Sequence, residues 1–275
     1  MTHYVCHNCG FWQRRFAVPA ACPVCEDFRH PLPPNGYVFR TADETAADHR
    51  TVVEEVLPDV FRFATEPAIG IGPCGWLLRT PLGNVHFEGC GWYDDAALAT
   101  LDRLGGVQIL SASHPHVYGA LWQVVKRFSP TVVIQNADLN FTQAFRVSFP
   151  FDEHLMLTPD IALHHTAGHT AGHTVLHWQS RRLLAAGDAL KFTFPEPGQT
   201  VGLPDTVSCH AAFDAHIPLS HNDVRRYADV MRPLDFDVVL TPWEVVTAGG
   251  KTAALRLFTK QLAGRPFADR MRIVR

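Results

Sequence analysis

The sequence predicts an α/β protein with a small metal-bound module at its amino terminus. Four cysteines near that terminus have the spacing of metal ligands. From about residue 50, β-rich and helical segments alternate, and several of the predicted strands end in histidine or aspartate. We therefore expect a zinc-ribbon module over residues 1–30, a linker rich in Pro and Gly over 31–50, and one large domain over 51–275.

Composition limits the classes of function. The 275 residues are 47% hydrophobic and 19% charged, which is typical of a globular chain with one large core. The 24 Lys and Arg are scattered and slightly outnumbered by 27 acidic residues, so we expect no nucleic-acid partner. No apolar run approaches the roughly 20 residues that span a bilayer, and the first residues do not resemble a secretory signal. We expect a cytoplasmic protein with a small-molecule substrate and no membrane partner, and we leave a homodimer open.

The amino-terminal cysteines form two CxxC pairs separated by 12 residues: Cys6, Cys9, Cys22 and Cys25. Two tight turns would each offer two thiolates to one tetrahedral ion. A segment this short buries too little apolar surface to fold alone, so the ion would supply its folding energy. Disulfides are the alternative, which a cytosolic chain disfavours. The other cysteines, Cys74, Cys90 and Cys209, are expected to be buried thiols.

The stretch "CHNCGFWQRRFAVPAACPVC" resembles the rubredoxin-like module of rubrerythrins, including Gly10 after the first cysteine pair and Pro23 within the second. The resemblance ends at Glu26, where the family has a glycine whose backbone N–H approaches a sulfur and tunes an iron centre. That departure favours a structural Zn²⁺ in the ribbon, with iron as the alternative.

Strands and helices are expected in alternation along the rest of the chain. Residues 56–64 are β-rich, and "GWLLRTPLGNVHFEG" has a turn between two strand-like runs, which indicates a hairpin. The segment "DDAALATLDRLGG" has an acidic start, apolar residues at helical spacing and a Gly-Gly stop, which predict a helix. The remaining expected strands are 107–113, 131–137, 173–178, 181–190 and 236–242, and the remaining expected helices are 119–128 and 221–234.

Candidate metal ligands occur at three places in this alternation of strands and helices. His114 and His116 come at the end of the strand at 107–113, and Asp188 ends the strand at 181–190. Three histidines four residues apart, His165, His169 and His173, lie in a segment whose glycines favour a loop over a helix. Imidazoles and a carboxylate on loops at the edge of a sheet suit Zn²⁺ or Fe²⁺.

The order His-x-His, "TAGHTAGH", "AAGDAL" resembles the metallo-β-lactamase fold superfamily, which includes glyoxalase II and persulfide dioxygenase. The resemblance covers roughly residues 51–250 and implies a four-layer αβ/βα sandwich with metal at one edge of its two sheets. By position, His114, His116 and His169 match the histidines of the first metal, and Asp188 matches its carboxylate. The position of His173 more often braces the loop in this family than binds metal.

The chain departs from the two-metal pattern of this family at three positions. Tyr118, Gly119 and Trp243 stand where a two-metal member has Asp, His and a late His, whereas the four groups of the first site are present. Because the ligands of the second site are missing and those of the first are present, we expect one metal ion. Tyr118 is either a catalytic phenol or a packed core aromatic, and both interpretations stay open. We expect Trp243 to form a pocket wall, with further apolar lining from Phe192, Phe194 and Phe213.

One ion held by three His and one Asp predicts a metal enzyme, for which Asp188 and Tyr118 are the candidate catalytic residues. With Zn²⁺, a metal-bound water would hydrolyse an ester, thioester, lactone or amide. The alternative is a mononuclear non-heme iron dioxygenase that resembles persulfide dioxygenase, with the ribbon as electron carrier. A second alternative is a non-catalytic binding protein stabilised by metal. The histidines outside the ligand set are expected to be surface or hydrogen-bonded residues: His165, His173, His177, His210, His216 and His221.

Overall fold

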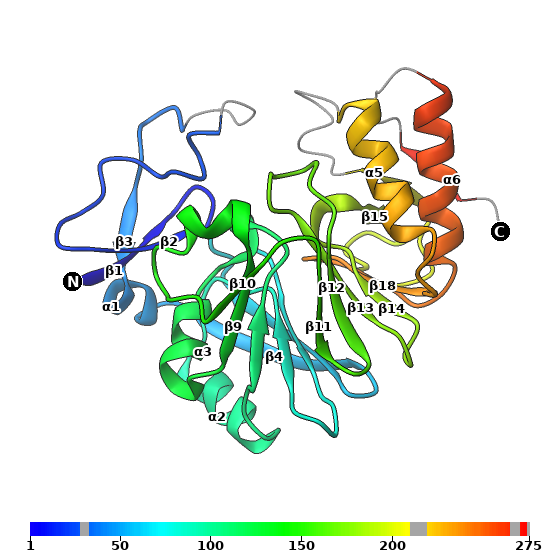
Figure 1. Ribbon diagram of the computed structural model, residues 1–275. Helices are drawn as coiled ribbons and strands as arrows, with labels where there is room; N and C mark the ends of the chain where they lie inside the picture. Colours follow the sequence, from blue (N-terminus) through cyan, green and yellow to red (C-terminus); the bar gives the residue numbers. More distant parts are fainter. Residues whose placement is uncertain (28–32, 210–218, 265–269, 274–275) are drawn as a thin grey trace. The chain divides into compact units, whose positions relative to one another are not determined.

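The computed structural model of the chain describes residues 1–27, 33–209, 219–264 and 270–273 (Figure 1). The chain divides into two compact units, Met1–Pro150 and Phe151–Arg275. The first is built on a small three-stranded sheet and a mixed seven-stranded sheet, and the second on another pair of three and seven strands. The expected α/β class with a small amino-terminal sheet is therefore confirmed.

The amino-terminal sheet surrounds the first cysteine pair. Strand β1 (Thr2–Cys6) ends at Cys6, and β2 (Trp12–Arg15) returns antiparallel to it just after Gly10. The third strand, β3 (Phe39–Thr41), pairs with the other edge of β1. The short helix α1 (Ala42–Ala46) follows directly, with Thr41 and Glu44 forming a capping box. The segment expected as a linker thus contributes a strand and a helix beside the ribbon.

The large sheet of the first unit has the order β10-β9-β8-β7-β6-β5-β4. Its strands are β4 (Arg50–Leu57), β5 (Val60–Glu66), β6 (Gly75–Leu78), β7 (Val85–Phe87), β8 (Ile109–Ser111), β9 (Thr131–Gln135) and β10 (Phe149–Phe151). Strands β4 to β7 pair antiparallel, which confirms the predicted hairpin, and β7 to β9 pair parallel. The two parallel crossovers contain the helices α2 (Asp95–Arg103) and α3 (Leu121–Phe128), both near their expected positions.

One hydrophobic core joins the ribbon to this sheet. It contains the four ribbon cysteines and Trp12 together with Leu101 of α2, Leu121 of α3 and Leu110 of β8. Helix α2 begins at the N-cap Asp94, whose carboxylate accepts from the Ala97 N–H at 2.8 Å. Because ribbon and sheet share a core, the short ribbon does not need to form one of its own.

The second unit has a sheet of order β11-β12-β13-β14-β18-β19-β16. Its strands are β11 (His154–Thr158), β12 (Ile161–His165), β13 (Thr174–Trp178), β14 (Leu183–Ala185), β18 (Val238–Leu240), β19 (Val245–Val246) and β16 (Val201–Gly202). A smaller sheet is formed by β15 (Lys191–Thr193), β17 (Thr206–Ser208) and β20 (Met271–Arg272). Helix α5 (His221–Met231), predicted over 221–234, packs beside α6 (Gly250–Ala263) (Figure 1).

Helix α6 is an element that the sequence interpretation missed. Its buried face includes Ala253, Ala254, Leu257 and Phe258, which recur at helical spacing. Two of these four positions are alanines, so the contrast between the buried and exposed faces is weak. Spacing rather than hydrophobicity is the signal that could have revealed this helix.

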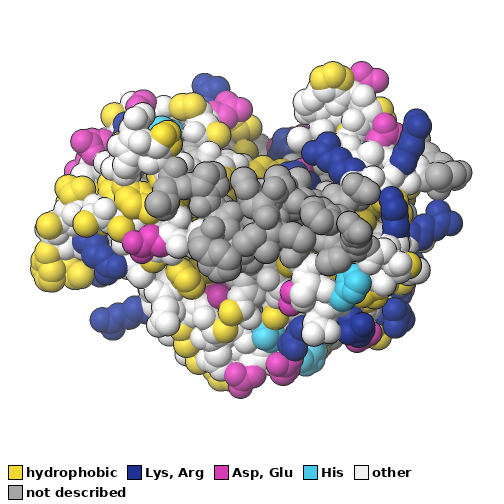
Figure 2. Space-filling view, turned by 90° about the horizontal axis from the view of Figure 1, so that it is seen from above, with side chains coloured by type: hydrophobic (Ala, Val, Ile, Leu, Met, Phe, Trp, Pro, Cys, Tyr) yellow, Lys and Arg dark blue, Asp and Glu magenta, His cyan; other side chains and the backbone are white. Residues whose placement is uncertain are grey.

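On the face drawn in Figure 2, basic, acidic and apolar side chains are interspersed. Among the described residues, no helix combines the length and the apolar character that crossing a membrane requires.

Asn84 ties the end of α2 to the large sheet, and this contact can be tested. Its buried side-chain amide donates to the carbonyls of Leu104 at 3.0 Å and Gly106 at 2.8 Å. Asn84→Ala would leave both carbonyls without this donor, so we expect the free energy of unfolding to fall by about 1–3 kcal/mol. Urea denaturation measures the change. The exposed Asn140→Ala is the control, expected to stay within about 0.5 kcal/mol of the wild type.

Candidate metal centres

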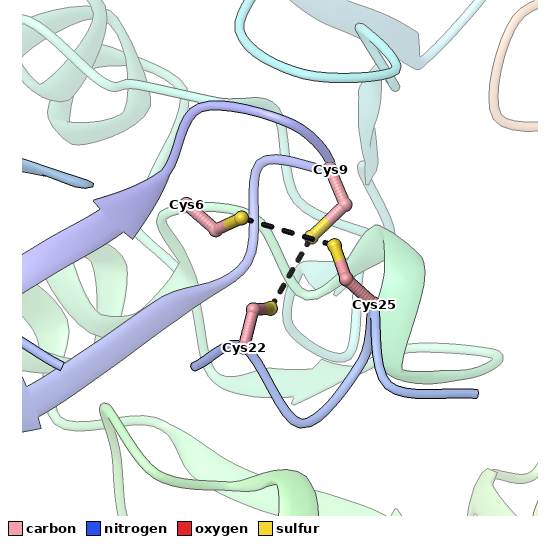
Figure 3. A group of neighbouring side chains, drawn as sticks. All are labelled: Cys6, Cys9, Cys22 and Cys25. Atoms are coloured by element: carbon pink, nitrogen blue, oxygen red, sulfur yellow. Dashed lines mark hydrogen bonds between the residues drawn. The ribbon is translucent and has the colours of Figure 1, made fainter. Parts of the chain in front are cut away.

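The four ribbon cysteines form the first candidate metal centre (Figure 3). All four are buried, and their sulfurs lie within 4.8 Å of one another. The Cys6 and Cys25 sulfurs are 3.8 Å apart, and those of Cys9 and Cys22 are 3.6 Å apart. A tetrahedral ion with zinc–sulfur bonds of about 2.3 Å requires sulfurs about 3.8 Å apart. None of the seven cysteines, all of them described, is in a disulfide, so the thiolate set fits an ion.

The polar groups around this cluster are consistent with an anionic set of sulfurs. The side-chain amide of Asn8 donates to the Cys25 sulfur at 3.3 Å. The backbone N–H of Glu26 donates instead to the Cys22 carbonyl at 3.0 Å. At the position where the rubredoxin-like module has its glycine, the amide is therefore bonded to oxygen.

Replacing both cysteines of the second pair tests this centre. Cys22→Ser combined with Cys25→Ser removes two of four thiolates, and two remaining sulfurs compete poorly with water for the ion. We expect the variant to contain about one metal ion less per chain, measured by elemental analysis after purification without added metal. Cys209→Ser, a buried thiol of the second unit, is the control, and unchanged metal content in the double variant would contradict the assignment.

The first unit presents two histidines of the second candidate centre. A 3₁₀ turn, Pro115–Val117, follows β8; His114 is its N-cap and His116 lies within it. Both side chains are buried, and their ring centroids are 5.2 Å apart. The Ser113 hydroxyl lies 2.8 Å from Nδ1 of His114. With Nδ1 engaged in this way, Nε2 is the nitrogen of His114 suited to a metal.

Glu88 holds this turn, and the sequence interpretation missed it. Its buried carboxylate accepts from the Ser113 backbone N–H at 3.1 Å, and its own N–H donates to the Ser111 carbonyl at 3.1 Å. The residue has φ of 64°, a backbone conformation rare for glutamate. An acid directly after β7, the strand beside β8, was the available signal.

Tyr118 and Gly119, which stand where a two-metal pattern would have Asp and His, have different environments. Tyr118 is buried and packs edge-on against Phe145, with ring centroids 5.6 Å apart. Burial raises its pKa well above the usual value, with Asp138 and Glu88 adding to the effect, so the phenol is protonated at neutral pH. Gly119 has φ of 43°, and a Cβ there would lie 2.2 Å from the Cys90 carbonyl oxygen. No side chain, and so no metal ligand, fits at position 119.

The second unit presents the remaining two groups. His169 lies in the glycine-rich loop between β12 and β13, and Asp188 lies on the turn after β14. Both are buried, and Nε2 of His169 is 3.3 Å from a carboxylate oxygen of Asp188. The His169 N–H donates to the Tyr227 hydroxyl at 2.9 Å, and Gly168 packs so closely against Tyr227 that a Cβ would lie 2.8 Å from the hydroxyl oxygen and 2.9 Å from the ring. Helix α5, which carries Tyr227, therefore fixes this loop.

His173 braces the same loop, as the family resemblance implies. Its Nε2 accepts from the Asp188 backbone N–H at 3.1 Å, so the ring proton lies on Nδ1. That proton is donated to the Thr166 hydroxyl at 2.6 Å, and this hydroxyl donates in turn to the His173 carbonyl at 3.0 Å. Both ring nitrogens of His173 are engaged within the second unit.

The expected pocket residues lie in different surroundings. Trp243 is half-buried, with the Lys191 ammonium 3.9 Å above its ring. Phe192 is buried in the core of the second unit, Phe194 packs against that core, and Phe213 lies outside the described residues. The expectation that they line a substrate pocket stays a prediction.

Lys191 and Glu244 are further residues that sequence reasoning missed. Lys191 forms an ion pair with the buried Glu244 at 2.6 Å, and Glu244 also accepts from the Thr241 hydroxyl. Burial raises the pKa of Glu244, although Lys191 opposes the shift.

The other singled-out side chains have the roles expected for them. His165, His177 and His221 are each hydrogen-bonded to a backbone carbonyl. Cys74, Cys90 and Cys209 are buried, and burial raises the pKa of Cys90 to about 12. His210 and His216 lie outside the described residues.

Comparison with known proteins gives one relative and many similar structures. No family model matches the sequence. The uncharacterized protein YmaE of Bacillus subtilis (strain 168) is 24% identical over 246 residues, which cover 86% of this chain and 87% of that protein.

The similar structures include metallo-β-lactamases. FIM-1 from Pseudomonas aeruginosa, solved in a mono-zinc form, is 9% identical with a TM-score of 0.55, over 79% of this chain and 98% of that one. DIM-1 is 11% identical with a TM-score of 0.54, over 77% and 98%. The rubredoxin oxygen:oxidoreductase of Desulfovibrio gigas is 8% identical with a TM-score of 0.57, over 77% and 62%. Matches of this length exceed either unit alone, so they include residues of both.

Proposed function

We propose that this chain, which has the metallo-β-lactamase fold, is a hydrolase that works with a single metal ion held by His114, His116, His169 and Asp188. The observation that carries the proposal is that each unit presents half of this ligand set, buried and held in place by its own neighbours. Ser113 and Glu88 hold the His114–His116 turn, and Tyr227 and His173 hold His169 and Asp188. A fold whose similarity extends over both units supports bringing the halves together.

A single ion agrees with the three positions that lack second-site ligands. Gly119 leaves no room for a side chain, and Tyr118 is a protonated phenol rather than a phenolate. Beside Trp243, the ammonium of Lys191 already provides a positive charge. The positions that would hold a second cation are therefore occupied by the packed residues Tyr118 and Gly119 and, beside Trp243, by the Lys191 ammonium.

The residues have separate tasks in the proposed reaction. When bound here, Zn²⁺ would lower the pKa of a water ligand to about 7 and so make hydroxide available to an ester, thioester, lactone or amide. The three neutral imidazoles would hold the ion, and the Asp188 carboxylate would offset part of its charge. His173 keeps the Asp188 backbone in place through the N–H at 3.1 Å.

A mononuclear iron oxygenase is the second candidate. Two His and one Asp also suit Fe²⁺, and the four-cysteine centre lies in the same core as the strand that leads to His114. The Glu26 N–H, bonded to the Cys22 carbonyl, favours zinc in the ribbon and hence the hydrolase. A third outcome, a metal-stabilised binding protein, would show the ion without turnover.

Removing His169 tests the centre. His169→Ala removes one of four ligands, so we expect this centre to bind zinc more weakly and to lose zinc-dependent hydrolysis, while the ribbon ion remains. Elemental analysis of zinc and iron, and turnover on a panel of esters, thioesters and lactones, are the measurements.

The matched control is His165→Ala at the end of β12, four residues before His169, where the imidazole bonds the Ala171 carbonyl at 2.8 Å. It should retain both ions and turnover. Two ions at this centre in the wild type would refute the single-ion proposal, and unchanged zinc affinity and turnover in His169→Ala would refute His169 as a ligand.

Tyr118→Phe separates the two interpretations of this phenol. Because the ring is buried against Phe145, we expect metal content to be unchanged and kcat to stay within about a factor of two. A loss of roughly 10²–10⁴ in kcat, the usual contribution of general acid–base groups, would instead make the phenol a catalytic donor. The comparison requires the same panel of substrates and a metal analysis of each preparation.

A further inference from the structure

We infer that the ribbon is a positioning module for the catalytic centre: the ion in the four-cysteine site sets the affinity of the His114–His116 turn for its own metal. The inference rests on the proposed function, because it takes these two histidines as metal ligands. It is carried by three consecutive contacts, all within the first unit, that lead from the cysteines to the turn without room for an added methyl group.

The first contact joins the turn Cys6–Gly10, here called the cysteine knuckle, to the loop after β5. A Cβ on Gly70 would lie 2.2 Å from the carbonyl carbon of Cys9 and 2.2 Å from the backbone nitrogen of Gly10. In the opposite direction, a Cβ on Gly10 would lie 3.2 Å from the Ile69 carbonyl oxygen. The knuckle that holds two of the four sulfurs therefore lies against Ile69 and Gly70, backbone on backbone.

The second contact joins this loop and the ribbon to the segment Gly89–Gly91. A Cβ on Gly91 would lie 2.9 Å from Cβ of Ile69, the residue that also meets Gly10. The indole N–H of Trp12, at the start of β2, donates to the Gly91 carbonyl at 3.0 Å. Trp12 and Ile69 are both buried, so the ribbon fixes Gly91 from two sides.

The third contact joins Gly89–Gly91 to the metal-binding turn. The Gly89 N–H donates to the Val117 carbonyl at 2.7 Å, and the Ala120 N–H donates to the Cys90 carbonyl at 2.8 Å. A Cβ on Gly119 would lie 2.2 Å from the Cys90 carbonyl oxygen, and one on Gly89 would lie 2.4 Å from the Tyr118 carbonyl oxygen. Val117 and Tyr118 directly follow His116, so a shift of the segment displaces the turn that carries both histidines.

The dependence on metal follows from the four convergent sulfurs. The ribbon side chains share the core of the unit, but an ion would tie the turn after β1 to Cys22 and Cys25 through these sulfurs and so fix its backbone. Without the ion, Cys9 and Gly10 no longer hold Ile69 and Gly70, and Gly91 loses both of its supports. Residues that only orient metal ligands typically change metal affinity by about 10–100-fold, which is the loss expected at the His centre.

Gly70→Ala tests the contact while leaving every ligand of both centres intact. Its control is Gly72→Ala in the same loop: Gly72 has φ of 65° against 59° for Gly70, but its Cβ would meet only the Ala68 side chain, at 3.1 Å. The probe is Co²⁺, because thiolate-to-cobalt charge transfer marks the ribbon and is absent from an imidazole–carboxylate centre. We expect Gly70→Ala to weaken Co²⁺ binding at the His centre about 10–100-fold and Gly72→Ala to leave it within about two-fold.

Two substitutions in the ribbon, Cys25→Ser and Trp12→Phe, test the same coupling. They provide the test if Gly70→Ala does not fold. Both should weaken Co²⁺ at the His centre and accelerate amide hydrogen exchange at Gly89 and Ala120, whose N–H groups bridge segment and turn. Unchanged Co²⁺ affinity in Cys25→Ser that has lost its ribbon ion would overturn the inference. Equal losses in Gly70→Ala and Gly72→Ala would overturn it as well.

The two proposals fail in different ways. A wild-type His centre that binds Co²⁺ but hydrolyses nothing leaves the inference standing and removes the hydrolase. A wild-type centre that binds no Co²⁺ removes the proposed metal centre, and unchanged exchange at Gly89 and Ala120 in Cys25→Ser then also removes the coupling.

Discussion

The segment Gly89–Gly91 lies directly on the backbone of the turn Val117–Ala120, and the position of His116 depends on that contact. Two hydrogen bonds of 2.7 and 2.8 Å join the segment and the turn, and neither Gly89 nor Gly119 has space for a Cβ. Glycine is therefore required at position 119 by packing as well as by its φ of 43°. The same glycine removes a ligand position for a second metal, so the incomplete metal motif has a structural cause.

The second unit holds its candidate ligands by a different means. Its loop is fixed by side chains: the Tyr227 hydroxyl accepts from the His169 backbone, and His173 connects Asp188 to Thr166. The defined ring proton of His173 makes this chain of bonds directional, since each donor meets one acceptor. Near it, Lys191 and Glu244 form a largely buried ion pair, whose disruption by loss of one partner typically costs 3–5 kcal/mol. The charge of the Glu244 carboxylate is therefore balanced by the Lys191 ammonium.

The parts of the fold and of the site that the sequence predicts are those with a local pattern. Two CxxC pairs, a hairpin with its turn, and capped helices are all specified within about 20 residues, and they lie where expected. Strand β3 lies in the segment predicted as a linker, because a three-residue strand that pairs with β1 leaves no periodic signal in the sequence. Glu88, Ser113 and Lys191 were missed for a related reason: their roles come from contacts across the sheet or along a turn, which spacing in the chain does not show.

A turn that carries metal ligands must be rigid before the metal arrives, because ligands that are free to move must be ordered on binding. In a two-metal member of this fold, a second ion would itself cross-link positions 118 and 119 to the rest of the site. Here those positions are a packed tyrosine and a glycine, and the cross-link is made instead by Gly89–Gly91, Ile69 and Trp12. Their common support is the four-cysteine ribbon, which shares the core of the unit. On this proposal the two candidate ions would have different roles: one would hold the scaffold of the turn, and the other would be bound by the turn.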